Sequence, residues 1–255
     1  APRGALSADA CMDLRTFSKN TVRGSDPRLD AVYGNFATNL RDIVRSAARA
    51  GIKTVLSTVV ANLKDSAPFV SLHRDDLKGS DLQAWQKAFD AGQLAWSLGD
   101  DSGAQTELER AAKLDPEYAD TFYLLGRIEE ECGRLKDARR DFIAALHWDA
   151  LRFRPDPRIN DVIRAVVRES GDSVVLVDAA RELGSDPDSA APLAGHEVLF
   201  EHVHFNWEGN YRMGLLLAKS CATLLPAFSN SGAASWLDPA ESATALGDTD
   251  YGHLS

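Results

Sequence analysis

One short stretch, residues 200–211, brings a carboxylate and two histidines together immediately before a long apolar segment. Glu201 and His204 are three residues apart, so in a tight turn the carboxylate reaches one ring nitrogen of the imidazole. Such a contact fixes the histidine tautomer and stabilises the imidazolium, as a general base in nucleophilic catalysis requires. The sequence therefore predicts a site in which His204 is the base and Glu201 orients it.

Two other interpretations of this stretch stay open. His202 and His204 are two residues apart, as are residues on one face of a strand, and this spacing suits a structural role for both. In that case Glu201 is only a solvated side chain at the start of the helix. The same two histidines supply two metal ligands, but the sequence shows no third or fourth ligand nearby. The residue types alone do not decide between these roles.

The segment after this stretch has the pattern of a helix that is anchored in a core. Asn206 stands where an N-cap residue is expected. The apolar residues expected to bury the helix are Tyr211, Met213, Leu215, Leu216, Leu217, Ala218 and Leu224. The candidate site is therefore expected to have a fixed scaffold behind it.

The composition is that of an ordinary globular protein with an acidic balance. The 255 residues are 44% hydrophobic and 26% charged, which is enough for a sizeable core. A net charge of -10 argues against a nucleic-acid partner or an anionic membrane partner. The cysteines Cys11, Cys132 and Cys221 are odd in number and far apart, so no disulfide framework is indicated. No apolar run reaches the ~18 residues of a membrane span.

Two β-branched apolar runs, residues 53–60 and 173–178, predict buried parallel strands with helices on both faces. The helix before the first strand shows apolar residues at spacings of three and four, and they are Leu29, Val32, Tyr33, Phe36, Leu40, Ile43, Val44 and Ala47. Two parallel strands do not form a stable sheet by themselves. We therefore expect either further strands before residue 1 or association with another polypeptide. If strands are missing, we expect the isolated chain to be unstable or to aggregate through its open strand edge.

A 34-residue period runs through the middle of the chain. The matching positions lie 34 residues apart: Gly92, Gly99, Ala104, Leu108 and Ala111 correspond to Gly126, Gly133, Ala138, Phe142 and Ala145. This is the period of tetratricopeptide repeats, in which small residues lie where the two helices of a hairpin touch. It predicts two hairpins, residues 85–98 with 101–114 and residues 119–132 with 135–148. Two repeats fall short of the roughly three that a solenoid core needs, so we expect them to pack on the rest of the chain.

Other polar residues fall where ligands are expected, at the carboxyl ends of the strands. Asn62 follows the first strand, where its amide suits either an oxyanion donor or a strand-to-loop turn. Asp178 ends the second strand and suits a cap or a salt bridge better than catalysis. Arg152, Arg154 and Arg158 suit either an anionic ligand or pairing with the excess of acidic residues.

Taken together, these residues make the chain resemble the carboxyl-terminal part of an SGNH (GDSL-like) hydrolase domain with an inserted tetratricopeptide pair. The resemblance covers about residues 26–218. It is carried by Asn39-Leu40, Asn62-Leu63 and Pro68-Phe69, by residues 54–58, 151–154, 201–204 and 209–211, and by the repeats. It implies an α/β fold, a three-layer, flavodoxin-like domain with a parallel sheet, that hydrolyses acyl or carbohydrate esters with a serine nucleophile. His204 then matches the catalytic histidine, and Glu201 matches its aspartate with one extra methylene.

The resemblance has gaps. We expect neither the Gly-Asp-Ser nucleophile motif nor the Gly-x-Asn-Asp motif of the family to be present in this chain. We therefore expect the nucleophile and the first three strands to precede Ala1, and we expect the chain alone to be inactive. If the chain is active alone, the nucleophile is to be sought among Ser57, Ser66 and Ser71.

The sequence thus predicts an α/β domain in two segments, residues 1–84 and 151–255, with an all-α insertion at residues 85–150. Two functions stay open: an ester hydrolase that uses Glu201 and His204, and a non-catalytic scaffold that binds a protein partner through the hairpins. The first implies a small ester substrate, and neither implies a cofactor. The sequence does not predict the compartment or the oligomeric state.

Overall fold

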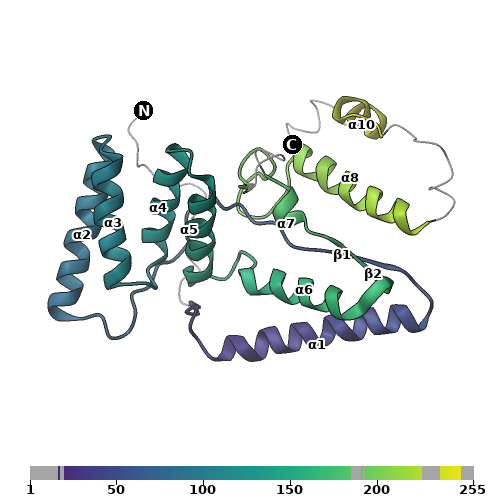
Figure 1. Ribbon diagram of the computed structural model, residues 1–255, viewed down its shortest axis with the longest axis horizontal. Helices are drawn as coiled ribbons and strands as arrows, with labels where there is room; N and C mark the ends of the chain where they lie inside the picture. Colours follow the sequence, from purple (N-terminus) through teal and green to yellow (C-terminus); the bar gives the residue numbers. More distant parts are fainter. Residues whose placement is uncertain (1–16, 18–19, 185–190, 192, 226–235, 248–255) are drawn as a thin grey trace.

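The chain, seen in a computed structural model, is a mixed α/β structure that is mostly helical and contains a small parallel sheet (Figure 1). The structure describes residues 17, 20–184, 191, 193–225 and 236–247. Cys11 lies outside these residues, and so do the strands expected before residue 1.

The two strands pair in parallel, as their β-branched sequences predict. β1 is Thr54–Ser57 and β2 is Val174–Val177. Their first residues pair with each other, Thr54 with Val174. Both strands are shorter than the predicted 53–60 and 173–178. The reason is visible at the end of β1, where the N–H of Val59 donates to the side-chain oxygen of Asn160 at 2.8 Å instead of to β2.

Helices lie on both sides of the strand pair (Figure 1). α1 (Arg28–Arg49) and α6 (Pro157–Ser170) pack together on one side, and α8 (Trp207–Leu224) lies on the other. One apolar cluster joins Val44, Val166 and Val174. A second joins α8 to the opposite face of the strands.

The apolar stripe predicted for α1 is only partly buried. Leu29 and Val44 are in the core, but Val32 and Ile43 are 56% and 62% exposed. A single neighbouring helix, α6, covers α1, and one helix contact covers a narrower stripe than the apolar pattern spans. The eight apolar residues that recur at helical spacing are therefore not all buried.

Four helices stand side by side at one end of the molecule (Figure 1). They are α2 (Gly79–Ser97), α3 (Asp101–Leu114), α4 (Ala119–Glu131) and α5 (Leu135–Trp148). α2 packs on α3 and α4 packs on α5, so the four helices expected between residues 85 and 148 are present, and α2 begins earlier than predicted.

The repeated glycines mark the closest approach of the helices in each hairpin. A Cβ on Gly92 would lie 2.7 Å from Leu108 Cγ, and a Cβ on Gly126 would lie 2.8 Å from Phe142 Cδ1. Each glycine faces the same repeat position of its partner helix, 16 residues further along the chain. The 34-residue period therefore has a steric cause, because a side chain at either glycine would separate the two helices.

The remaining elements are short. A 3-10 turn, η3 (Gly171–Ser173), precedes β2, and α7 (Ala179–Glu182) follows it. α10 (Pro239–Leu246) begins at Asp238 with a capping box and packs on α8. Within the described residues, none of the helices is both long enough and apolar enough to cross a bilayer.

Candidate functional site

The site is built on a closed loop, residues 199–205, in front of α8. Leu199 and Phe205 form an antiparallel bridge at its base. Inside this bridge the N–H of Phe200 donates to the carbonyl oxygen of His204 at 2.8 Å. Glu201 and His202 therefore lie in a loop whose two ends are held together.

Asn206 and Gly209 join this loop to α8. Asn206 Oδ1 accepts from the N–H of Gly209 at 2.9 Å, so Asn206 is the N-cap that the sequence predicts. A Cβ on Gly209 would lie 2.0 Å from the carbonyl oxygen of Val198, which shows that only glycine allows the helix to start so close to the loop. The helix thereby fixes where the loop ends.

The carboxylate of Glu201 is at the centre of the loop. Oε1 accepts from the backbone N–H of His204 at 3.0 Å, and Oε2 accepts from that of Val203 at 3.2 Å and contacts that of His202. Burial opposes ionisation of Glu201, but hydrogen bonds from His204 and from the backbone of the loop outweigh it, so its pKa lies below the ordinary value. Glu201 is therefore an ionised carboxylate with a fixed orientation.

Both histidines of the loop contact this carboxylate. His204 Nδ1 meets Oε1 of Glu201, and His202 Nδ1 meets Oε2. The predicted hydrogen bond between Glu201 and His204 is therefore present. Because an ionised carboxylate only accepts, each Nδ1 carries a proton, and in the neutral ring Nε2 then has the lone pair. Both rings are thus in the tautomer that a general base needs.

The two histidines differ in access. The side chain of His204 is 77% exposed, and that of His202 is 22% exposed. The His202 ring packs edge-on against Phe69, with 5.2 Å between ring centroids. A substrate can reach Nε2 of His204 from solvent, whereas His202 is held between Phe69 and Glu201.

Asn62 connects this loop to the carboxyl end of β1. Its Nδ2 donates to the carbonyl oxygen of Glu201 at 2.9 Å, and its backbone N–H donates to that of His202 at 3.0 Å. Its Oδ1 accepts from the N–H of Asp65 at 2.9 Å. Asn62 is fully buried, so in this structure it positions the loop; the predicted contact with an oxyanion stays a prediction.

A buried ion pair supports the site from the side of the hairpins. Arg154 pairs with Asp149 at 2.9 Å and donates to the carbonyl oxygens of Asn62 at 3.1 Å and Ser66 at 2.7 Å. Its guanidinium also lies over the ring of Phe69, 5.5 Å from the centroid. In the sequence Arg154 looks equivalent to Arg152 and Arg158, and no local pattern indicates that it holds Asn62 and Phe69 in place.

The other predicted polar residues form structural pairs. Arg152 and Arg158 bind Asp156 at 2.9 Å and 3.2 Å, so both arginines pair with acidic residues. Asp178 binds Arg164 at 2.8 Å and accepts from the hydroxyl of Thr58 at 3.0 Å. Asp178 and Arg164 thus stabilise the carboxyl end of the strands. Among the described residues, none of these side chains has a hydrogen bond or ion pair with His204.

Two of the three serines considered as nucleophiles have hydroxyl groups that bind other parts of the chain. Ser57 Oγ donates to the carbonyl oxygen of Thr58 at 2.9 Å, and Ser71 Oγ accepts from the N–H of Asp120 at 2.9 Å. Among the hydrogen bonds of the described residues, none joins a serine hydroxyl to the His204 ring.

A Gly-Asp-Ser tripeptide does occur, at residues 171–173, so the expectation that this motif is absent from the chain is wrong. It forms η3 in front of β2, and Ser173 Oγ donates to the carbonyl oxygen of Ser170 at 2.8 Å. This is the amino end of the strand, whereas the Glu201 loop contacts Asn62 beyond the carboxyl end of β1. In a parallel pair these ends are opposite, so Ser173 does not face His204.

The described part of the chain contains no group of three or more acidic, histidine or cysteine side chains that is placed to hold a metal ion. Comparison with protein-family models, with curated proteins and with solved structures gives no match. The functional argument therefore rests on the geometry of the loop.

Proposed function

We propose that Glu201 and His204 are the acid–base part of a serine ester hydrolase of the SGNH kind, with His204 as the base. The observation that carries this proposal is the Glu201–His204 pair itself. It combines an ionised carboxylate on Nδ1 with a solvent-exposed ring whose Nε2 is free to accept a proton. The parallel strand pair with helices on both faces agrees with a three-layer sheet domain, which is part of the proposal.

In this mechanism Nε2 of His204 takes the proton of a serine hydroxyl as the oxygen attacks the ester carbonyl. Glu201 accepts the Nδ1–H bond throughout and stabilises the imidazolium. The imidazolium then gives its proton to the departing alkoxide, which leaves an acyl-serine. In the second half, Nε2 deprotonates a water molecule as it attacks the acyl carbon. The bond to the serine oxygen then breaks, and the imidazolium returns the proton to that oxygen. The serine is supplied by a segment outside the described residues.

An apolar cavity near the start of α8 supports an ester as the substrate. It has a volume of about 330 Å³ and is lined by Trp207, Tyr211 and Leu215 of α8 and by Trp236, Leu237 and Leu246. Trp207 is three residues after His204. Ligand cavities are commonly about 300–1,000 Å³ and mostly apolar, so this one suits the acyl or alcohol part of an ester.

The test is hydrolysis of p-nitrophenyl acetate by the protein at its native length, compared with its His204→Ala and His196→Ala variants. General acid–base catalysis contributes roughly 10²–10⁴-fold, so His204→Ala should lower kcat/KM by that factor. His196 is the matched control, because it is exposed and its ring makes only a 3.4 Å contact with the carbonyl oxygen of Leu199. Its variant should stay within about twofold of the wild type. Equal rates for the wild type and His204→Ala would reject the proposal.

A second function, docking of a protein partner by the helical hairpins, is favoured by one observation. Leu94 and Leu98 lie one turn apart on α2 and its C-cap and are 60% and 76% exposed. Large apolar side chains on one exposed face are typical of interaction surfaces. If ester hydrolysis is absent, this scaffold function becomes the leading proposal.

A further inference from the structure

A second cavity lies beside the segment that follows β1. Asn62 faces the Glu201 loop, but Ala61 and Leu63 line a different space, enclosed by α5, α6 and α7. This cavity has a volume of about 240 Å³. Neither Glu201 nor His204 is among its lining residues, so it is separate from the proposed hydrolase site.

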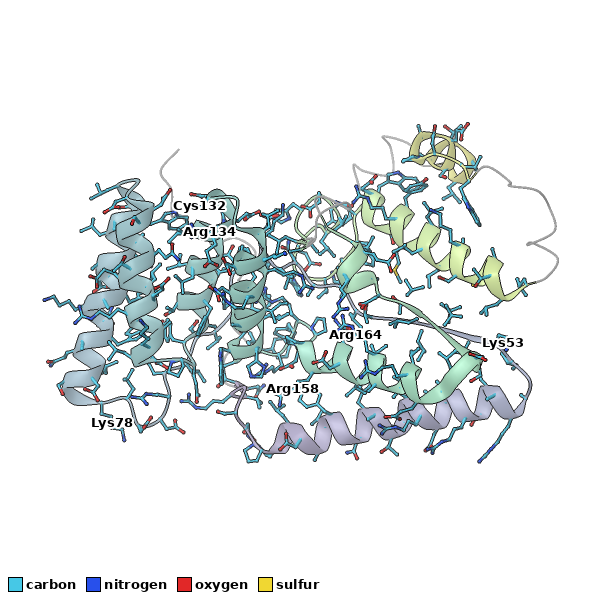
Figure 2. The ribbon with its side chains drawn as sticks, in the orientation of Figure 1. Lys53, Lys78, Cys132, Arg134, Arg158 and Arg164 are labelled. Carbon is cyan, nitrogen blue, oxygen red and sulfur yellow. The ribbon has the colours of Figure 1, made fainter. Side chains whose placement is uncertain are left out.

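Three arginines from three helices line this cavity: Arg139 of α5, Arg164 of α6 and Arg181 of α7. Arg164 is held by Asp178, with two hydrogen bonds of 2.9 Å and 2.8 Å, and extends between α6 and α7 (Figure 2). Arg181 reaches the same carboxylate at 3.5 Å. One aspartate is therefore shared by two guanidinium groups.

Of the three arginines, Arg139 is the one without an ion pair to Asp178 among the described residues. Its one hydrogen bond is a long one, 3.5 Å to the carbonyl oxygen of Ala180, and among the described residues it has no carboxylate at ion-pair distance. Burial lowers its pKa, as do the charges of Arg181 and Arg164, while Asp178 acts in the opposite sense. A half-buried guanidinium next to two others is unfavourable unless an anion accompanies it.

Among the described residues, the charged side chains at the cavity do not balance. Arg139, Arg164 and Arg181 carry three positive charges, and Asp161 and Asp178 carry two negative charges, which leaves one positive charge at the cavity. This excess stands out in a chain whose net charge is -10. A monovalent anion would balance it, whereas a phosphate dianion would overcompensate.

The rest of the lining is apolar. It includes Val59, Ala61, Ile143, Leu146 and Pro157. Asn160 also lines the cavity, but both ends of its amide are bound to the backbone of Val59 at 2.8 Å. The site therefore offers one unpaired guanidinium and an aliphatic wall.

We propose that this space, the arginine cavity, binds a small aliphatic carboxylate. The planar carboxylate accepts the paired N–H groups of Arg139, a geometry that a guanidinium matches well. The short alkyl chain packs against Ile143 and Leu146. The volume of about 240 Å³ is below the range of drug-sized ligand sites, so an acid of a few carbons fits.

The test is isothermal titration calorimetry of the protein with butyrate, acetate and inorganic phosphate at constant ionic strength. Butyrate should bind more tightly than acetate, because its longer chain covers the apolar wall, and more tightly than phosphate. Arg139→Gln should weaken butyrate binding about ten- to a hundredfold, the range for a lost hydrogen bond to a charged group. Lys136→Gln is the control, because Lys136 is exposed on the same helix and the charge change is the same.

Thermal unfolding without ligand separates binding from folding. Arg139→Gln should melt at or above the wild-type temperature, because it removes repulsion and only one long hydrogen bond. If that variant does not fold, Arg139→Lys, which keeps the charge but loses the paired N–H groups, carries the same comparison. Equal butyrate affinity in the wild type and the Arg139 variant, phosphate binding as tight as butyrate, or no butyrate binding would each overturn the proposal.

Discussion

At the residue scale, Glu201 has two roles that cannot be separated by one substitution. Its oxygens accept from the ring of His204 and also from the backbone N–H groups of the loop. A Glu201→Gln change would place an amide N–H against these donors and would disturb the loop itself. His204→Ala removes the ring and leaves these backbone bonds intact, which makes it the cleaner test of catalysis.

The spacing of Glu201 and His204 was enough to predict their contact, because three residues in a tight turn bring the two side chains together. It did not predict that His202 would share the carboxylate. That contact depends on Phe69, which is 133 residues earlier in the chain and packs on the His202 ring. A local pattern carries no information about such a distant neighbour.

A buried carboxylate pair in the second hairpin gives a prediction at this scale. Glu129 of α4 is 3% exposed, and burial, followed by the charge of Asp141 and a hydrogen bond with it, raises its pKa to about 7. The folded state therefore prefers protonated Glu129. The stability that this preference gives is complete below 4.5, the ordinary pKa of a glutamate, and is lost as the pH rises through about 7.

Glu129→Gln should therefore flatten the pH dependence of stability. At pH 8 it should raise the free energy of unfolding by roughly 1–3 kcal/mol, because it removes a poorly paired buried charge, and at pH 5 it should change little. Urea denaturation at the two pH values measures this, with the exposed Glu109→Gln as the control. A destabilised variant at pH 8 would show that the ionised form of Glu129 is needed.

At the scale of elements, the helical hairpins were the most predictable part of the fold. The period placed Gly92 and Gly126 at equivalent positions, and the structure shows each of them against a bulky partner, Leu108 or Phe142. A repeat in the sequence indicates a repeated contact, so this contact can be predicted without knowledge of the rest of the chain. The exposed part of α1, around Val32 and Ile43, was not predictable in this way because burial depends on what covers the helix.

Gly126→Ala tests this steric account. The added Cβ would lie 2.8 Å from Phe142 Cδ1, and Phe142 is 1% exposed and has no room to move. Overpacking of this kind typically costs about 1–3 kcal/mol. Gly34→Ala is the matched control, because Gly34 is also inside a helix but has nothing within 4 Å of the new Cβ. It should stabilise the chain by roughly 0.5–1 kcal/mol, the usual preference of a helix for alanine.

Chemical denaturation of the two variants decides the outcome. A decrease in the unfolding free energy for Gly126→Ala together with an increase for Gly34→Ala agrees with the account. Equal changes in the unfolding free energy of the two variants would mean that Gly126 is not required by the close approach of the helices.

At the scale of the whole molecule, the buried ion pair of Asp149 and Arg154 helps to join the hairpins to the strand pair. Asp149 follows α5 directly and accepts from the N–H groups of Phe69 and Val70 at 3.0 Å and 3.1 Å. Its partner Arg154 binds the carbonyl oxygen of Asn62, which in turn holds the Glu201 loop. The hairpins thus pack on the rest of the chain, as two repeats without a third must, and they support the candidate site.

The central claim is that His204 activates a serine, and covalent labelling tests it most directly. A fluorophosphonate reacts with a serine oxygen that a base has activated, with loss of fluoride, and mass spectrometry then identifies the labelled residue. In the protein at its native length we expect one labelled serine, with labelling abolished in His204→Ala and unchanged in His196→Ala. Absence of a labelled serine, or labelling that persists in His204→Ala, would contradict the account.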